Sequence, residues 1–81
     1  MMLNLATIDD LIFEGEISSI KAPGVVGYFE VLNNHAPMIS TLKEGIVSWT
    51  HENNKKTVHI NKGILEVLNN TVIVLVDRLE T

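Results

Sequence analysis

Three histidines are the first residues of this chain that could do chemistry, because imidazole is a common metal ligand. His35, His51 and His59 match no known spacing of zinc ligands, and the chain has no cysteine to complete such a set. The absence of cysteine also excludes a disulfide framework. The sequence therefore predicts no metal site.

A hydrolytic site would need a nucleophile, a base and an acid that orients the base. The serines lie in or beside apolar runs, and none has the flanking pattern of a nucleophile elbow: Ser18, Ser19, Ser40 and Ser48. Asp9 and Asp10 are adjacent on an expected turn, where carboxylates are usually solvated. Residues 24–27 contain two glycines but lack the lysine and the following helix of a phosphate loop. We expect a non-catalytic protein that uses no cofactor.

Charge and hydropathy narrow the choice of partners. The net charge is −4 and the only adjacent basic pair is Lys55–Lys56, whereas nucleic-acid binding depends on clustered Lys and Arg. No apolar stretch approaches the roughly 20 residues of a transmembrane helix, and the first residues do not form a signal peptide. We expect a soluble intracellular protein that meets a membrane only through another protein.

Short apolar runs alternate with turn signals every eight to twelve residues or so, a pattern typical of a β-sandwich or barrel. No window has the apolar periodicity and the cap of a helix. Asn69–Asn70 is expected to close a two-residue hairpin, because Asn tolerates positive φ. A longer hairpin loop is expected at 51–56. The expected strands are 3–6, 11–13, 17–22, 28–32, 38–42, 46–50, 57–60, 64–68 and 71–76.

The chain has more aliphatic side chains than so small a domain can easily bury. It is 46% hydrophobic, although only 5% of its residues are aromatic. Residues 72–76 are apolar on both faces of an expected central strand, so a partner could cover the face turned away from the core. Two interpretations stay open: a contiguous patch that binds a partner, or scattered exposed aliphatics of no special role.

The loop at 24–27 carries two valines that a loop does not need, and Tyr28–Phe29 follow directly. Apolar and aromatic side chains at a loop tip are common at the centres of interfaces. Alternatively, Val26 or Phe29 closes the end of the sandwich. Trp49 alternates with polar neighbours and is expected to face the core or a contact surface.

Four segments, in order along the whole chain, resemble the N-terminal domain of the epsilon subunit of F-type ATP synthases. They are residues 13–16 (FEGE), 22–29 (APGVVGYF), 34–45 (NHAPMISTLKEG) and 63–75 (GILEVLNNTVIVL). The third segment carries the strongest signature, His-Ala-Pro. The chain departs from the family pattern at Glu30, Asn33 and Lys62.

The resemblance implies a fold as well as a role. The expected fold is all-β: a flattened sandwich of two mostly antiparallel sheets with about ten short strands, in a single domain over residues 1–81. His-Ala-Pro would mark the corner where the chain passes from one sheet to the other. Pro37 suits the start of a strand there, since proline cannot donate a ladder hydrogen bond.

The implied function is that of a central-stalk, or rotor, subunit of a proton-translocating F-type ATP synthase. Such a subunit is peripheral, at the cytoplasmic face of the bacterial inner membrane, and couples ring rotation to ATP synthesis without catalysis of its own. The resemblance places Thr7, His35 and Ser40 at the gamma subunit. It places a loop, with Tyr28 at its tip, on the c-ring: Gly24, Val25, Val26, Gly27, Tyr28, Phe29 and Glu30.

The family's epsilon subunits continue into a pair of helices that bind ATP in some members. The sequence stops at Thr81, shortly after the last expected strand. We therefore expect no helical domain, no ATP binding and no inhibition by a helical hairpin. The alternative function is a free-standing β-sandwich module that binds a small ligand or a peptide.

Overall fold

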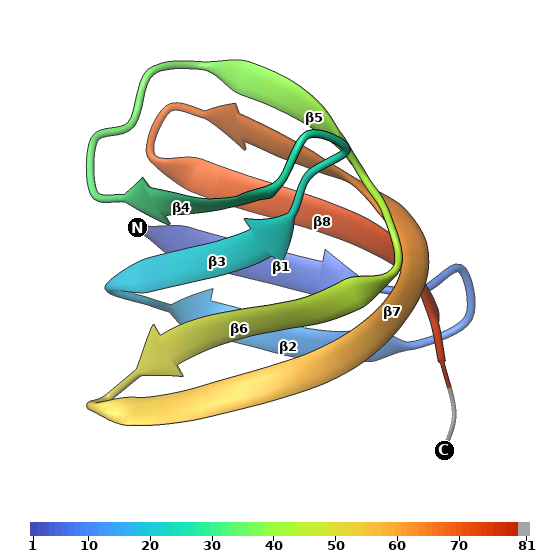
Figure 1. Ribbon diagram of the computed structural model, residues 1–81. Helices are drawn as coiled ribbons and strands as arrows, with labels where there is room; N and C mark the ends of the chain where they lie inside the picture. Colours follow the sequence, from blue (N-terminus) through green and yellow to red (C-terminus); the bar gives the residue numbers. More distant parts are fainter. Residues whose placement is uncertain (80–81) are drawn as a thin grey trace.

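The computed structural model describes residues 1–79, and these contain eight β-strands and no helix (Figure 1). No segment in this range could therefore cross a membrane as a helix. Residues 80–81, which the expected domain includes, lie outside the described part. The strands are β1 (Met2–Ala6), β2 (Leu11–Glu16), β3 (Ser19–Pro23), β4 (Tyr28–Leu32), β5 (Met38–Leu42), β6 (Gly45–His51), β7 (Asn54–Leu68) and β8 (Thr71–Arg78).

Two layers of strands face each other, and the long strand β7 belongs to both (Figure 1). The first sheet has the order β2-β1-β8-β7-β5, and only the β1–β8 pair in it is parallel. The second sheet has the order β7-β6-β3-β4 and is antiparallel throughout. The changeover falls at Ile60, which pairs with Gly45 of β6 and with Arg78 of β8. The expected two-sheet, mostly antiparallel sandwich is confirmed.

The core lies between the sheets and is built by the period-two alternation of the strands. On β8, Val72, Val74 and Val76 are buried, whereas the residues between them are exposed. Trp49 is also buried, so the expectation that it faces the core is confirmed. Its ring centroid lies 5.4 Å from that of Phe13, on the facing sheet.

The described residues form eight strands, not about ten, and two of the nine ranges expected from the sequence belong to β7, which is one continuous strand of 15 residues. The expected strands at 57–60 and 64–68 both lie within β7, and a loop was expected at 51–56. In the structure His51 pairs with Asn54, so the hairpin closes on Glu52 and Asn53, whose φ angles are 50° and 65°. The polar residues after this turn are exposed but paired. Their polarity, read alone, wrongly indicated a loop.

Besides Asn53–Asn54 in this hairpin, the chain has two Asn-Asn pairs, Asn33–Asn34 and Asn69–Asn70, which lie together at one end of the first sheet. Asn69–Asn70 closes the β7–β8 hairpin with φ angles of 51° and 57°, as predicted. The Asn70 side chain accepts a hydrogen bond from the backbone N–H of Asn34 at 2.9 Å and donates one to Asn33 Oδ1 at 3.2 Å. Residues 33–37 carry the chain from β4 of the second sheet to β5 of the first. The corner expected at His-Ala-Pro is therefore confirmed.

Candidate docking surfaces

The face of the first sheet that points away from the core is apolar. Ile73 and Leu75 of β8 point outward, and the strand register places Leu75 between Ala6 and Ile64. None of the described residues covers this face. The prediction that residues 72–76 form a strand with apolar side chains on both faces, one of them against the core, is therefore confirmed. The partner expected to cover the other face stays a prediction.

We call this surface the apolar outer face. The large apolar side chains on it come from all five strands of the first sheet, and their exposed fractions run from 39% to 68%: Met2, Leu11, Ile39, Ile64, Leu68, Ile73 and Leu75. Glu66 and Asn4 flank Ile73 as its polar neighbours. Soluble monomers rarely expose so many neighbouring aliphatic side chains, so the arrangement is typical of a protein–protein contact surface.

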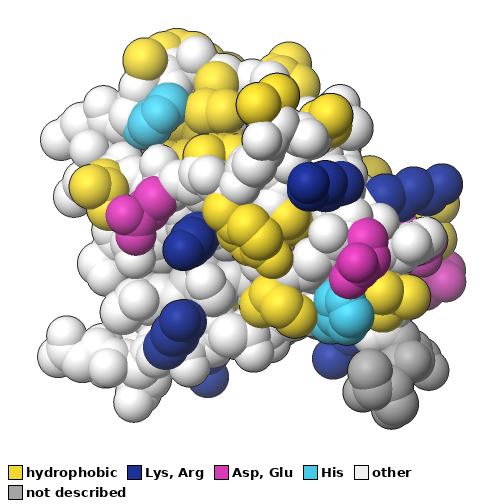
Figure 2. Space-filling model, in the orientation of Figure 1, with side chains coloured by type: hydrophobic (Ala, Val, Ile, Leu, Met, Phe, Trp, Pro, Cys, Tyr) yellow, Lys and Arg dark blue, Asp and Glu magenta, His cyan; other side chains and the backbone are white. Residues whose placement is uncertain are grey.

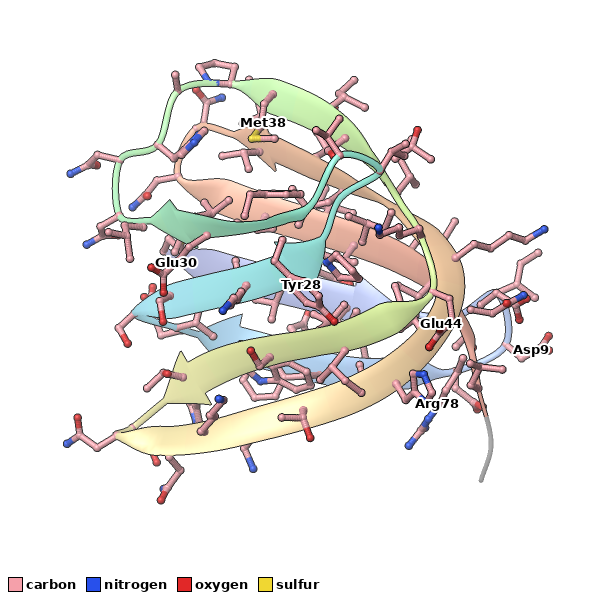
Figure 3. The ribbon with its side chains drawn as sticks, viewed as in Figure 1. Asp9, Tyr28, Glu30, Met38, Glu44 and Arg78 are labelled. Carbon is pink, nitrogen blue, oxygen red and sulfur yellow. The ribbon has the colours of Figure 1, made fainter. Side chains whose placement is uncertain are left out.

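One end of the apolar outer face deepens into a pocket of about 610 Å³. Ile64 and Leu75 line it together with the turn that joins β1 to β2, residues 7–10. Lys62 and Arg78 contribute positive charge to the same pocket. Figure 3 shows Asp9 and Arg78 at this end of the molecule.

The outer face of the second sheet has a different character. Figure 2, which views this face, shows separate groups of hydrophobic side chains among Lys, Arg, Asp, Glu and His side chains. At its centre the Tyr28 hydroxyl accepts a hydrogen bond from the backbone N–H of Ile46 at 2.8 Å, and Lys21 Nζ lies 5.6 Å from the ring centroid. Mixed charge and satisfied polar groups make this face an ordinary solvent surface.

The prediction that Tyr28 lies at the tip of the loop is wrong, because Tyr28 is the first residue of β4. Its side chain extends over β3 toward β6 (Figure 3). The ring can lie there because Gly45 has no side chain: a Cβ atom at this position would come within 2.6 Å of the Tyr28 hydroxyl oxygen. The contact joins β4 to β6 across the intervening strand.

Two valines form the actual tip of the loop between β3 and β4. Val25 is 62% exposed and Val26 is fully exposed. A Cβ atom on Gly24 would lie 2.9 Å from the carbonyl oxygen of Gly27, so the loop is too tight for a side chain at its first glycine. Phe29 packs against the core, so the end-plug interpretation holds for Phe29 and not for Val26.

The three residues expected at the gamma subunit do not form a cluster. Thr7 follows β1 at the end of the first sheet that carries the pocket, and His35 lies at the opposite end, beside the Asn70 turn. The His35 ring is exposed, and its Nδ1 atom is 2.7 Å from the carbonyl oxygen of Ala36. Ser40 of β5 lies instead beside the 24–27 loop, and the two line a hollow of about 460 Å³.

The other two histidines make separate contacts. His51 Nδ1 lies 2.6 Å from the carbonyl oxygen of Glu16, which joins the two sheets, and His59 pairs with the Glu44 carboxylate. Within residues 1–79, no three His, Cys, Asp or Glu side chains converge as metal ligands would.

A sandwich with one apolar outer face and an apolar loop tip is typical of a domain that docks on another protein. Comparisons with known proteins identify its family. A family model described as the β-sandwich domain of the ATP synthase delta/epsilon chain matches residues 1–81. The chain belongs to this family.

Two curated relatives are bacterial ATP synthase epsilon chains. That of Chlorobaculum tepidum is 40% identical over 76 residues, which cover 93% of this chain and 86% of the relative. That of Leptospira borgpetersenii is 35% identical over 77 residues, which cover 93% of this chain but only 61% of the relative.

Solved structures have the same fold. A chain in a structure of the OSCP/F1/c-ring assembly of the Euglena gracilis mitochondrial ATP synthase matches with a TM-score of 0.85 and 25% identity. The match covers 91% of this chain and 48% of the Euglena chain. A chain from the central stalk and c-ring of the Tetrahymena thermophila enzyme matches with a TM-score of 0.79 at 19% identity, which covers 94% of this chain and 62% of that one and shows the fold alone.

Proposed function

We propose that this chain is a central-stalk subunit of an F-type ATP synthase that binds the gamma subunit and the c-ring. In this role it couples ion-driven ring rotation to ATP synthesis at the cytoplasmic face of a bacterial inner membrane, without catalysis of its own. The observation that carries the proposal is the apolar outer face, which a protein of this family would cover with another subunit. The family membership supplies the identity of the complex.

The gamma subunit is proposed to lie on the apolar outer face. Stable interfaces between subunits have an apolar centre and a polar rim. The outward side chains of β5, β7 and β8 supply such a centre, and Glu66 and Asn4 supply polar groups within it. Thr7 and His35, at the two ends of the first sheet, belong to the rim in this arrangement, and Ser40 lies beyond it.

The c-ring is proposed to contact the β3–β4 loop through Val25 and Val26. These side chains project from the sandwich and make no contribution to its core. Because the loop is held by a tight glycine turn, its valines can enter an interface with little loss of backbone freedom. Glu30, further along β4, is exposed on the outer face of the second sheet.

Copurification tests the proposal. The chain, carrying an affinity tag, is expressed with the gamma subunit and c subunit of the same organism, and the eluted subunits are identified by mass spectrometry. We expect the gamma subunit to coelute with the chain, and the c-ring to join when gamma is present. A gamma subunit that passes through the column would refute the assignment.

The pocket of about 610 Å³ favours a second candidate, a free-standing module that binds a small ligand or a peptide. Its volume lies within the range of ligand sites, and its lining combines apolar side chains with charged ones. Failure of gamma to bind, together with saturable binding of a peptide or metabolite to the isolated chain, would favour this alternative.

A further inference from the structure

An exposed isoleucine occupies the turn between β1 and β2. Ile8 is 89% exposed, and the turn around it is otherwise polar, with Thr7 before it and Asp9 and Asp10 after it. Turns of this kind favour Asn, Asp, Ser and Gly, because these residues satisfy the local backbone. An isoleucine here contributes nothing to the core of the described structure.

Hydrogen bonds on both sides of Ile8 fix the backbone of the turn that carries it. The Thr7 hydroxyl oxygen accepts hydrogen bonds from the backbone N–H groups of Asp9, at 3.2 Å, and of Asp10, at 2.9 Å. The backbone N–H of Thr7 donates to the carbonyl oxygen of Asp10 at 2.8 Å and closes the turn from the other side. A partner that contacts Ile8 therefore does not have to order this segment, which lowers the entropic cost of binding.

Ile8 is also one wall of the pocket at the end of the apolar outer face. Ile64 and Leu75 belong both to that face and to the lining of the pocket, so the two surfaces are continuous. The volume of about 610 Å³ exceeds that of any single side chain, so the pocket can admit one together with part of its backbone. Lys62 and Arg78 bring positive charge to the same rim as the acidic turn.

We propose that Ile8 and the pocket form a socket for an apolar side chain of the gamma subunit, and that Thr7 is a positioning residue that acts through Ile8. The inference rests on the proposed function, since it takes the occupant from the subunit assigned to the apolar outer face. Thr7 stays at the rim of the interface, and its hydroxyl group acts on binding by fixing the turn that presents Ile8.

The test measures the dissociation constant of the full chain for purified gamma subunit, by calorimetry, with four variants. Ile8→Ala is expected to weaken binding roughly tenfold, because it removes an apolar side chain from the wall of the pocket. Thr7→Val keeps the shape and removes the hydroxyl group that accepts both hydrogen bonds. It is expected to weaken binding about threefold to fivefold, because the turn must then be ordered when the partner binds. Thr7→Ser, which keeps the hydroxyl group, is expected to bind like the wild type.

The double variant Thr7→Val/Ile8→Ala separates positioning from contact. If Thr7 acts through Ile8, the double variant binds as Ile8→Ala does, because no side chain is left to position. If the dissociation constant of the double variant rises by the product of the two single fold-increases, the role given to Thr7 is overturned. Melting temperatures of all four variants show whether a binding defect comes from unfolding, and Ile8→Ala is expected to melt like the wild type.

Failure of this inference can be distinguished from failure of the proposed function. The socket would be overturned if Ile8→Ala bound the gamma subunit with the dissociation constant of the wild type while a variant at Ile73, in the middle of the apolar outer face, bound it more weakly. The docking face would then still stand. Absence of gamma binding by the wild-type chain would overturn both.

Discussion

Replacement of Ile73 by threonine tests the apolar outer face at its centre. Ile73 lies on the central strand β8 between Asn4 of β1 and Glu66 of β7. Threonine is also β-branched, so the strand propensity of the position is largely kept. The substitution changes the polarity of the face and leaves the backbone pairing of β8 as it is.

The expected loss of binding free energy follows from the exposure of this side chain. Complete burial of an isoleucine is worth roughly 1.5–3 kcal/mol, and Ile73 is 49% exposed, so docking gains about half of this amount. Burying the new hydroxyl group without a partner adds a penalty of about 1 kcal/mol. The sum is about 2 kcal/mol, which corresponds to a dissociation constant about 30-fold higher.

The assay is calorimetric titration of the gamma subunit with each variant, alongside urea unfolding of the chain alone. Ile46→Thr is the matched control, because Ile46 is 40% exposed but lies on the second sheet. Both variants are expected to lose similar, small amounts of folding free energy, and only Ile73→Thr is expected to lose affinity. Unchanged affinity of Ile73→Thr together with weaker binding of Ile46→Thr would move the docking surface to the second sheet and refute the reasoning.

Four further outcomes are expected. Val26→Asp should keep the unfolding free energy within about 0.5 kcal/mol, since Val26 is fully exposed, and should abolish c-ring binding in a pull-down; retained binding would exclude the loop tip. Gly63→Ala should destabilise the fold by roughly 1–3 kcal/mol in urea, because its Cβ atom would lie 2.8 Å from the Leu75 carbonyl oxygen. Tyr28→Phe should cost about 1 kcal/mol through the lost hydrogen bond to β6, with gamma affinity unchanged. His35→Ala should lower gamma affinity more than the melting temperature, and the reverse order would remove His35 from the rim.

Features that depend on neighbouring residues in the sequence were predictable. Asn69–Asn70 indicates a two-residue hairpin because Asn accepts the positive φ angles that such a turn needs, and the structure has them at both residues. The apolar run at 72–76 indicates a strand with two apolar faces. In the structure its alternate side chains enter the core and the apolar outer face.

Features that depend on a distant strand were not predictable in the same way. The hairpin residues after Asn53 are polar, and only their pairing with β6 makes them a strand. Tyr28 lies across the second sheet because the distant Gly45 leaves room for its ring. The continuity of β7 likewise depends on partners in both sheets.

Ile8 was missed although the sequence carries a signal for it. A threonine followed two residues later by aspartate is typical of a turn capped by a hydroxyl group, and an isoleucine between them has no structural purpose in such a turn. The apolar outer face was predicted at its central strand only. Its full extent depends on the register that brings β1, β5 and β7 beside β8.

The strand shared by the two sheets also affects how the domain resists force. In a sandwich of two separate sheets, one layer can slide over the other when only side-chain contacts oppose the shear. Here sliding would require β7 to bend or to lose backbone hydrogen bonds, since it is paired with β6 in one layer and with β8 in the other. The register between β7 and β8 is irregular between Ile60 and Lys62, and the Asn61 side chain there donates a hydrogen bond to Asp77 at 3.2 Å, which joins the two strands across the irregularity. A torque applied to one sheet therefore reaches the other through the covalent backbone of β7.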